Sequence, residues 1–395
     1  MHLFINSLAA SAGGGLTYIR NVLPRLAQRS DVRVTVVLGT DLRREFSALP
    51  NVEFVEREIS LRQRFWFEQV KLGELIQRSG AEVLVSAGNF AMRHSPVPQI
   101  LLSRNSIYTS EDYFRDLRER REYRMWVDTH IRGWLAKKSV EWADVTVAPS
   151  EAFAEELRRR TGRPVYAIHH GFDETVFADD SKLPSPELAQ KLHETKGAFK
   201  ILFVSHYNYY RNFETLLRAL TFLPNGIKGR PVKLLLTCKF LGNQIPGSYR
   251  TEKAARMVDD LGLAEKVVQV GSVPYDQLHY LYRQADLYVT PAYTETFAHP
   301  LVEAMASALP IVASDLPVHR EICGEAAVYF PRFSAEAVAK SIMQIATSTD
   351  TAARMQAAAL VQVRQFSWKN HVEAILELST TLVNKRRQVH ELRST

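Results

Sequence analysis

The sequence contains very little cysteine and no long hydrophobic run. Its two cysteines, Cys238 and Cys323, lie far apart and match no metal-ligand spacing, so neither a disulfide framework nor a zinc site is indicated. A reducing cytoplasm is the simplest location for such a chain. No window approaches about 18 uninterrupted apolar residues, and no basic segment precedes the apolar run Leu3–Ile5. We therefore expect neither a membrane span nor an export signal.

The composition is that of a globular protein with room for two domains. Of the 395 residues, 46% are hydrophobic and 24% are charged, which leaves no long stretch polar enough to stay unfolded. The formal net charge of +7 is compatible with nucleic acid, an anionic membrane surface or phosphorylated small molecules, and charge alone does not choose among them. No nucleic-acid-binding motif is recognised, so we expect no nucleic-acid partner.

Strand-like apolar runs alternate with helix-length segments along the chain. In the first half the runs are Leu3–Ile5, Val32–Leu38, Val83–Val85, Ile100–Leu102 and Val145–Ala148, and in the second half they are Lys200–Ser205, Val232–Thr237, Val267–Val270, Leu287–Thr290 and Ile311–Ala313. This alternation predicts an α/β fold with two Rossmann-like, doubly wound parallel sheets. The stretch 178–198 is polar and contains prolines. It predicts a boundary between domains at 1–180 and 198–370.

The loops that follow the strands are the places to search for a site, because ligands of open α/β sheets bind beyond the carboxyl ends of the strands. After Leu287–Thr290, a loop with Glu295 leads to Pro300 and a helix that contains Glu303. Free amides at a helix start suit a diphosphate, and carboxylates accept hydrogen bonds from sugar and ribose hydroxyls. The alternative is one glutamate that caps the helix and one that is solvated.

Two further loops could face a ligand. After Lys200–Ser205, His206 and Arg211 could neutralise a leaving diphosphate, although a tyrosine-rich surface turn is the alternative. Between the first strand and the first helix, Gly13, Gly14 and Gly15 form a glycine loop on which a phosphate or sugar could approach the backbone. This triplet lacks the spacing Gly-x-Gly-x-x-Gly of a dinucleotide site.

Several motifs together resemble the family-4 retaining glycosyltransferases, which have the GT-B fold. The main motif runs from Ala285–Asp286 through Pro291, Glu295, Phe297, Pro300, Glu303–Ala306 and Pro310–Ser314 to Glu321. Two stretches agree with it: Ala143–Ser150 resembles a strand that ends in serine, and His170–Asp173 with Phe177 resembles the Asn-Gly-Val-Asp turn of the family. The resemblance covers nearly the whole chain in the right order.

The resemblance implies an enzyme that transfers a hexose-type sugar from a nucleoside-diphosphate sugar to a hydroxyl acceptor, with retention of configuration. It also implies an N-terminal acceptor domain and a C-terminal donor domain that face a central cleft, with a helix at about 370–395 crossing back to the N-terminal domain. Such an enzyme needs no cofactor and no metal. The sugar nucleotide is its donor substrate.

The family motif assigns expected roles to residues of the donor domain. Glu303 would hold the donor ribose, Glu295 would lie near the sugar, and Arg211 with His206 would face the leaving diphosphate. The other residues expected to contact the donor are Phe297, Ala298, Leu301, Val302, Gly271, Val273, Gly14 and Gly15.

The chain departs from the family pattern at several of these positions. The paired basic motif has His206 and Arg211 where the family has arginine and lysine. Arginine keeps a permanent charge, whereas histidine is mostly neutral at pH 7. Thr296 and Ala298 stand where the family often has glycine, so two side chains intrude near the sugar. Ala308 also replaces a glycine, at a cost of about 1 kcal/mol if its backbone is left-handed.

On the acceptor side, the family histidine that follows the strand Ile100–Leu102 is missing. Its role is unfilled or passes to Arg104 or Asn105, and His94 lies nearby in the sequence. The segment 112–139 is rich in arginine and lysine and contains Trp126 and Trp134. It predicts either a salt-bridged, solvated helix or one that docks on an anionic membrane and a lipid-linked glycan acceptor.

Two rival functions stay open from the sequence. The first is a sugar-nucleotide-binding protein of the same fold with impaired catalysis, which the altered basic pair makes plausible. The second is a sugar-nucleotide epimerase. For a transferase, we expect a cytoplasmic protein at the inner face of a membrane, in surface-polysaccharide synthesis.

Overall fold

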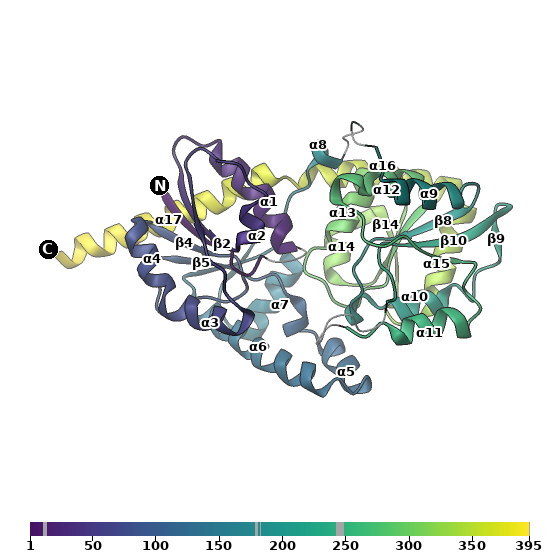
Figure 1. Cartoon of the computed structure of the whole chain (residues 1–395), viewed down its shortest axis with the longest axis horizontal. Helices are drawn as coiled ribbons and strands as arrows, with labels where there is room; N and C mark the ends of the chain where they lie inside the picture. Colours follow the sequence, from purple (N-terminus) through teal and green to yellow (C-terminus); the bar gives the residue numbers. More distant parts are fainter. Residues whose placement is uncertain (11–13, 178–180, 182, 242–248, 395) are drawn as a thin grey trace. The chain divides into compact units, whose positions relative to one another are not determined.

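The computed structural model describes residues 1–10, 14–177, 181, 183–241 and 249–394. It forms two compact units, and Figure 1 shows the path of the chain through both. The first unit contains Met1–Thr109, Val127–Gly171 and Ser367–Thr395, and the second contains Ser110–Trp126 and Phe172–Phe366. The segment Ser110–Trp126 therefore belongs to the second unit, although we expected the first domain to include it.

The first unit contains a parallel sheet with the strand order β3-β2-β1-β4-β5-β6-β7. Its strands are β1 His2–Asn6, β2 Arg33–Leu38, β3 Val52–Glu56, β4 Val83–Ser86, β5 Gln99–Leu102, β6 Val145–Ala148 and β7 Val165–Ala167. The alternating residues Leu3 and Ile5 of β1 pack against α1 (Gly14–Ala27) and α17 (Trp368–Ser394), whereas Phe4 packs on the other face, against α4 (Leu72–Ser79). Because helices cover both faces, the central strands consist of continuous apolar runs.

The remaining helices of the first unit connect these strands. They are α2 Thr40–Arg43, α3 Leu61–Val70, the 3-10 turn η1 Ser106–Tyr108, α6 Tyr123–Trp142, whose first turn lies in the second unit, and α7 Glu151–Thr161. The segment 112–139, which we expected to form one basic helix, is two helices, because the chain breaks at Arg121 with a φ of 58°. None of the described helices is long and apolar enough to cross a membrane.

The second unit repeats the doubly wound pattern. Its sheet has the order β11-β10-β8-β12-β13-β14, with the short β9 antiparallel to β10. The strands are β8 Phe199–Phe203, β9 Gly226–Ile227, β10 Arg230–Leu236, β11 Val267–Gln269, β12 Leu287–Thr290, β13 Ile311–Ser314 and β14 Ala327–Phe330. The predicted α/β fold with two doubly wound parallel sheets is confirmed.

The helices of the second unit surround this sheet. They are α5 Glu111–Glu119, α8 Glu174–Phe177, α9 Pro186–Glu194, α10 Phe213–Ala219, α11 Glu252–Asp260, α12 Leu278–Gln284, α13 His299–Ala306, α14 Pro317–Cys323, α15 Ala335–Thr347 and α16 Thr349–Gln362, with the 3-10 turns η2 Tyr209–Arg211, η3 Tyr275–Gln277, η4 Gly324–Ala326 and η5 Val363–Gln365. The main core joins alternate residues of β8 and β10 to α10, α11 and α15.

The end of the chain returns to the first unit through α17. Trp368 at its start is buried and stacks on His170, with ring centroids 5.4 Å apart. A Cβ atom on Gly171 would lie 1.9 Å from the backbone nitrogen of Trp368, so only glycine fits at this contact. This packing gives a physical reason for the histidine-glycine pair in the turn after β7.

Candidate functional site

The candidate donor site lies at the carboxyl ends of the central strands of the second sheet. β12 pairs with β8 on one side and with β13 on the other, and all three are parallel. The loops that follow them therefore meet at one edge of the sheet. The segments after these strands carry Arg211 in η2 after β8, Glu295 in the loop after β12 and His319 in α14 after β13.

Arg211 and Glu295 form an ion pair between two of these loops. The Arg211 Nη1 donates to the Glu295 Oε2, and the Arg211 guanidinium lies 5.1 Å from the centre of the Tyr210 ring. The other Glu295 oxygen accepts the Thr296 amide at 3.1 Å. Burial alone would lower the pKa of Arg211, but the Glu295 carboxylate raises it above its ordinary value. The guanidinium is thus charged while it is largely buried, and its Nε has no hydrogen-bond partner in the described part of the chain.

Glu303 lies one turn inside α13 and is buried. Its Oε2 accepts a hydrogen bond from the Tyr282 hydroxyl at 2.7 Å. Burial raises the pKa of Glu303 to about 7, although the bond from Tyr282 acts to lower it. Burial raises the pKa of the Tyr288 hydroxyl on β12; the Glu303 and Glu295 carboxylates raise it further, whereas Arg211 lowers it.

The start of α13 is shaped by Ala298, which has a φ of 64°. No side chain caps this helix end, Pro300 has no N–H to donate, and the Leu301 amide donates to the Ala298 carbonyl at 2.9 Å. The positive end of the helix dipole still lies at this terminus. The side chains of Phe297, Leu301 and Val302 are buried. Only the backbone of these residues can line a ligand, as the family motif implies.

His319 is a residue of this edge that the sequence analysis missed. It is fully buried, and its Nδ1 lies 2.9 Å from the Ser314 carbonyl oxygen. Burial lowers its pKa to about 4, and the charges of Glu295 and Arg211 also act on it. The imidazole is therefore neutral at pH 7, and its Nε2 has no hydrogen-bond partner among the described residues. Its position after a predicted strand was the only signal in the sequence.

Three other predicted donor residues lie on the loops after β8 and β11. The side chain of His206 is exposed, and its carbonyl oxygen accepts from the Ser205 hydroxyl at 2.7 Å. Gly271 and Val273 follow β11, which is separated from β8 by β10. Gly271 has a φ of 89°, and a Cβ there would lie 2.9 Å from the Lys239 Cε, so only glycine fits this turn without strain.

In the first unit, the structure brings Arg104 and Gly14 together. The Arg104 Nη1 donates to the Gly14 carbonyl at 3.3 Å, its Nη2 donates to the Ala87 carbonyl, and its guanidinium lies 4.7 Å from the centre of the Tyr18 ring. Burial lowers the pKa of Arg104 to about 10, which leaves it charged at pH 7.

Two glycines of the predicted glycine loop are helical. Gly14 and Gly15 form the first turn of α1, and Gly13 lies outside the described residues. A Cβ on Gly15 would lie 3.2 Å from the Ala10 Cα. A close approach between two backbone segments therefore explains one of these glycines without a ligand.

The other acceptor-side candidates lie in separate loops. The Asn105 Oδ1 accepts the Ile107 amide at 3.3 Å and caps η1. Asn105, Lys137 and Arg160 help to line a cavity of about 170 Å³ in the first unit. His94 is exposed in the loop after β4. No group of three or more His, Cys, Asp or Glu residues within the described ranges could hold a metal ion.

Comparisons with known proteins match both halves of the chain. The family Glycosyl transferases group 1 matches residues 184–362, and Glycosyltransferase Family 4 matches residues 12–176. The O-antigen chain mannosyltransferase B of Escherichia coli is 33% identical over 101 residues, which cover 26% of this chain and 26% of the relative. The D-inositol 3-phosphate glycosyltransferase of Mycolicibacterium smegmatis is 26% identical over 267 residues, which cover 66% of this chain and 58% of the relative. The matches thus span about a quarter to three fifths of the length of these relatives.

A solved structure gives the fold. Anabaena Alr3699/HepE in complex with UDP-glucose superposes with a TM-score of 0.72 at 16% identity, over 97% of this chain and 100% of that one. At this identity the likeness shows the architecture alone. The two family matches, which together span nearly the whole chain, and the two doubly wound sheets lead to one conclusion: the chain belongs to the group 1, family-4 glycosyltransferases and has the GT-B fold.

Proposed function

We propose that the protein transfers a hexose-type sugar from a nucleoside-diphosphate sugar to a hydroxyl acceptor, with retention of anomeric configuration. The observation that carries this proposal is the largely buried Arg211–Glu295 ion pair in the loops that lead into η2 and α13. Two relatives support it: HepE holds UDP-glucose in its crystal structure, and the Escherichia coli relative is an O-antigen chain mannosyltransferase. UDP-sugars are therefore the first donors to test.

In this proposal, the ion pair opens when the donor binds. The Glu295 carboxylate turns to the sugar hydroxyls, and Arg211 turns to the diphosphate. Together with the positive end of the α13 helix dipole, the guanidinium stabilises the negative charge that grows on the departing diphosphate, an electrostatic effect that is large where water is excluded. The acceptor hydroxyl attacks the anomeric carbon from the face that the diphosphate leaves, so the configuration is retained. No protein nucleophile is required.

Glu303 would anchor the nucleotide. An ionised carboxylate accepts hydrogen bonds from both ribose hydroxyls, whereas the protonated form accepts less well. Because its pKa is raised to about 7, we expect donor affinity to increase between pH 6 and pH 8. Hydrogen bonds from the two ribose hydroxyls would offset part of the free-energy cost of burying the charged Glu303 carboxylate.

We propose that the reaction needs neither a metal ion nor another cofactor, because the Arg211 guanidinium and the dipole of α13 supply the positive charge. Chelator-treated enzyme should keep the turnover of untreated enzyme. A loss of turnover that added Mg²⁺ restores would contradict this part of the proposal.

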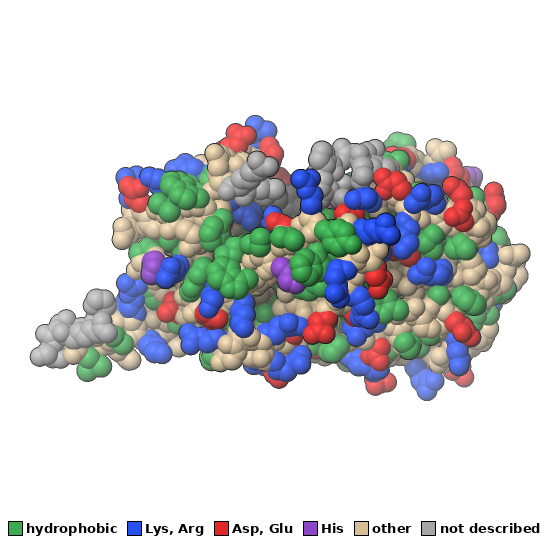
Figure 2. All heavy atoms as spheres, turned by 90° about the horizontal axis from the view of Figure 1, so that it is seen from below, with side chains coloured by type: hydrophobic (Ala, Val, Ile, Leu, Met, Phe, Trp, Pro, Cys, Tyr) green, Lys and Arg blue, Asp and Glu red, His purple; other side chains and the backbone are tan. Residues whose placement is uncertain are grey.

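We propose that α6 brings the enzyme to an anionic membrane surface, where it meets a lipid-linked glycan acceptor. Tyr123, Val127, Ile131 and Trp134 are each 49% to 61% exposed, and at about 100° per residue they share one face of the helix. Arg124 and Lys137 flank that face and form no ion pair with any residue that the structure describes. Figure 2, which views the underside of Figure 1, shows apolar side chains gathered among Lys and Arg.

Vesicle sedimentation tests this membrane contact. Wild type should bind phosphatidylglycerol vesicles and leave phosphatidylcholine vesicles free, and binding should weaken with salt. The variant Ile131→Ser/Trp134→Ser should bind about tenfold less. As a matched control, Phe222→Ser removes an exposed apolar side chain of the second unit and should change nothing. Equal binding by all three proteins would refute the role of α6.

The rival with a specific observation behind it is a binding protein with impaired catalysis. The observation is the exposed His206, which stands where the family has an arginine. Proton NMR of sugar nucleotide mixed with the enzyme decides between the two, because it detects both transfer and slow hydrolysis and shows the configuration of the first product. A retained anomer supports the transferase. Binding with no product at all would support the rival, and an epimerised sugar nucleotide would indicate an epimerase.

A further inference from the structure

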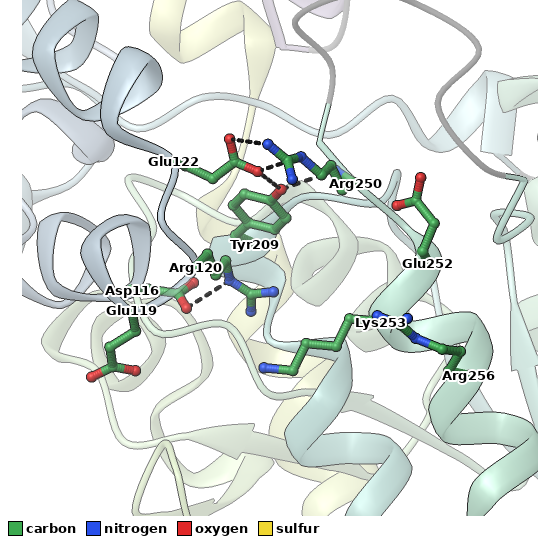
Figure 3. A pocket seen from close by; sticks show the side chains of 9 residues that line it. All are labelled: Asp116, Glu119, Arg120, Glu122, Tyr209, Arg250, Glu252, Lys253 and Arg256. Carbon is green, nitrogen blue, oxygen red and sulfur yellow. Dashed lines mark hydrogen bonds and ion pairs between the residues drawn. The ribbon is translucent and has the colours of Figure 1, made fainter.

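The segment Ser110–Trp126 comes from the first half of the sequence but packs against the candidate donor loops. It leaves the first unit after Thr109 and returns to it at Val127. Its helix α5 contacts the turn η2, which contains Arg211. With α11, the segment lines a cavity of about 490 Å³, and Figure 3 shows the charged side chains of this region.

Arg120 is the centre of the contact. Its Nε donates to the Asp116 Oδ1 at 2.7 Å, and its Nη1 donates to the Glu214 Oε1 at 2.7 Å. The guanidinium lies 4.2 Å from the centre of the Tyr209 ring. All three charged side chains are at most 17% exposed. A buried network of this kind fixes one arrangement, because any other leaves a charge without a partner.

One arm of the contact holds the loop of Arg211. The Tyr209 hydroxyl donates to the Glu122 Oε1 at 2.9 Å and accepts the Arg250 amide at 3.0 Å, and the Arg250 side chain pairs with Glu122 at 2.8 Å. Figure 3 shows these three side chains pointing toward one another. Tyr209 opens η2, and Arg211 closes it. The segment thus fixes the turn that aims the guanidinium.

The other arm holds the loop of Glu295. The Tyr293 hydroxyl donates to the Asp116 Oδ2 at 2.8 Å, and the Tyr293 amide donates to the Tyr210 carbonyl at 3.0 Å. Tyr293 precedes Glu295 by two residues, and Tyr209 precedes Arg211 by two. Both members of the ion pair are therefore tied, through a neighbouring tyrosine, to the same short segment.

We propose that Asp116, Arg120 and Glu122 are positioning residues that hold the Arg211 and Glu295 loops in the arrangement that binds the donor. The proposal rests on the function proposed for that site. Hydrogen bonds with fixed directions set the angle of each loop, which apolar packing alone leaves looser. No carboxylate of the segment needs to touch the substrate.

A double-mutant cycle tests the route through Tyr293. Calorimetric titration with UDP measures donor-site affinity in wild type, Asp116→Asn, Tyr293→Phe and the double variant. Each single change should weaken UDP binding about tenfold, and the double variant should lose clearly less than the product of the two losses, because both changes remove the Tyr293–Asp116 hydrogen bond. Tyr123→Phe, an exposed tyrosine of the same segment, is the matched control and should bind as wild type does. Unchanged affinity in both single variants, or additive losses in the double variant, would overturn the proposal.

Hydrogen exchange without ligand separates this proposal from the proposed function. The amides of 207–211 and 292–297 should exchange at least tenfold faster in Asp116→Asn than in wild type or Tyr123→Phe, while the melting temperature stays within about 2 °C. If wild type fails to bind UDP, the exchange rates still show whether the segment Ser110–Trp126 holds the loops of Arg211 and Glu295 in place. Unchanged exchange, or a lower melting temperature with unchanged UDP affinity of the folded protein, would reduce the segment to a structural role and overturn the proposal.

Discussion

Each unit holds a largely buried arginine near the carboxyl end of its parallel sheet, but the two are held differently. Arg211 in the second unit pairs with the Glu295 carboxylate, which raises its pKa above the ordinary value, although burial opposes this. Arg104 in the first unit donates to two backbone carbonyls and faces the Tyr18 ring, and burial lowers its pKa to about 10. A carboxylate partner can move to a substrate hydroxyl, whereas backbone carbonyls stay in place. We therefore expect Arg211 to change partners during the reaction and Arg104 to stay fixed.

The largest effect should come from Arg211. Arg211→Ala removes the cation that faces the diphosphate and should lower turnover by about 10² to 10³. Arg218→Ala, an exposed arginine of α10 in the same unit, is the control and should keep full turnover. Steady-state kinetics with saturating donor measure both. Wild-type turnover in Arg211→Ala would remove Arg211 from the mechanism.

We expect a change of Arg104 to lower activity less than a change of Arg211, and to affect the acceptor rather than the donor. Arg104→Met keeps an apolar stem of similar length and should reduce transfer to the acceptor about tenfold, with nucleotide affinity within twofold of wild type. Titration with UDP and transfer kinetics separate these two quantities, and circular dichroism checks the fold. A large loss of nucleotide affinity would mean that Arg104 belongs to the donor side.

We expect the buried Glu303 to make the free energy of unfolding depend on pH. Burial raises its pKa in the folded chain from 4.5 to about 7, so between these values the unfolded chain releases a proton that the folded chain keeps. The folded state therefore loses stability as pH rises through this window and carries the full penalty above pH 7. Glu303→Gln has no such penalty and should gain about 1 to 3 kcal/mol over wild type at pH 8. Urea unfolding at pH 5 and pH 8 measures the gain, and an equal effect at both values would contradict it.

The smallest effect should come from Ala308, outside both arginine sites. Its φ is 51°, so the backbone is left-handed, as the replaced glycine of the family motif suggested. Ala308→Gly should stabilise the fold by about 0.5 to 1 kcal/mol, since relief of strain exceeds the added entropy of the unfolded chain. Urea unfolding measures this change in the free energy of unfolding. The control is Ala306→Gly within α13, which should destabilise the fold. Stabilisation by both changes would point to another cause.

Much of the fold could be predicted from the sequence because the central strands are buried on both faces. Each expected strand is present, with ends that differ by at most two residues. Four strands were missed, and each has a weaker pattern. Val52–Glu56, which mixes apolar and acidic residues, and Ala327–Phe330 lie at sheet edges, and Gly226–Ile227 and Val165–Ala167 are very short. An edge strand needs only half of its residues to be apolar, so its signal is small.

The candidate site could be predicted only in part. The loops of Arg211 and Glu295 follow strong strands and carry family residues, so the sequence indicates both. The contacts of Tyr209 with Glu122 and of Tyr293 with Asp116 join residues 87 and 177 positions apart, and no local pattern encodes such a pairing. The sequence predicts a salt-bridged, solvated helix or a membrane-docking one for segment 112–139, whereas Asp116 and Glu122 of this segment accept hydrogen bonds from Tyr293 and Tyr209 of the donor loops.

The most direct test of the account is donor binding that depends on Glu303. Thermal-shift titration of wild type with UDP-, GDP-, ADP- and dTDP-sugars should find one donor class that raises the melting temperature by several degrees through mass action. Glu303→Ala should lose that shift with the same donors, while Glu265→Ala, an exposed glutamate of the same unit, should keep it. Binding of no sugar nucleotide by wild type, or an undiminished shift in Glu303→Ala, would contradict a donor site at the carboxyl edge of the second sheet.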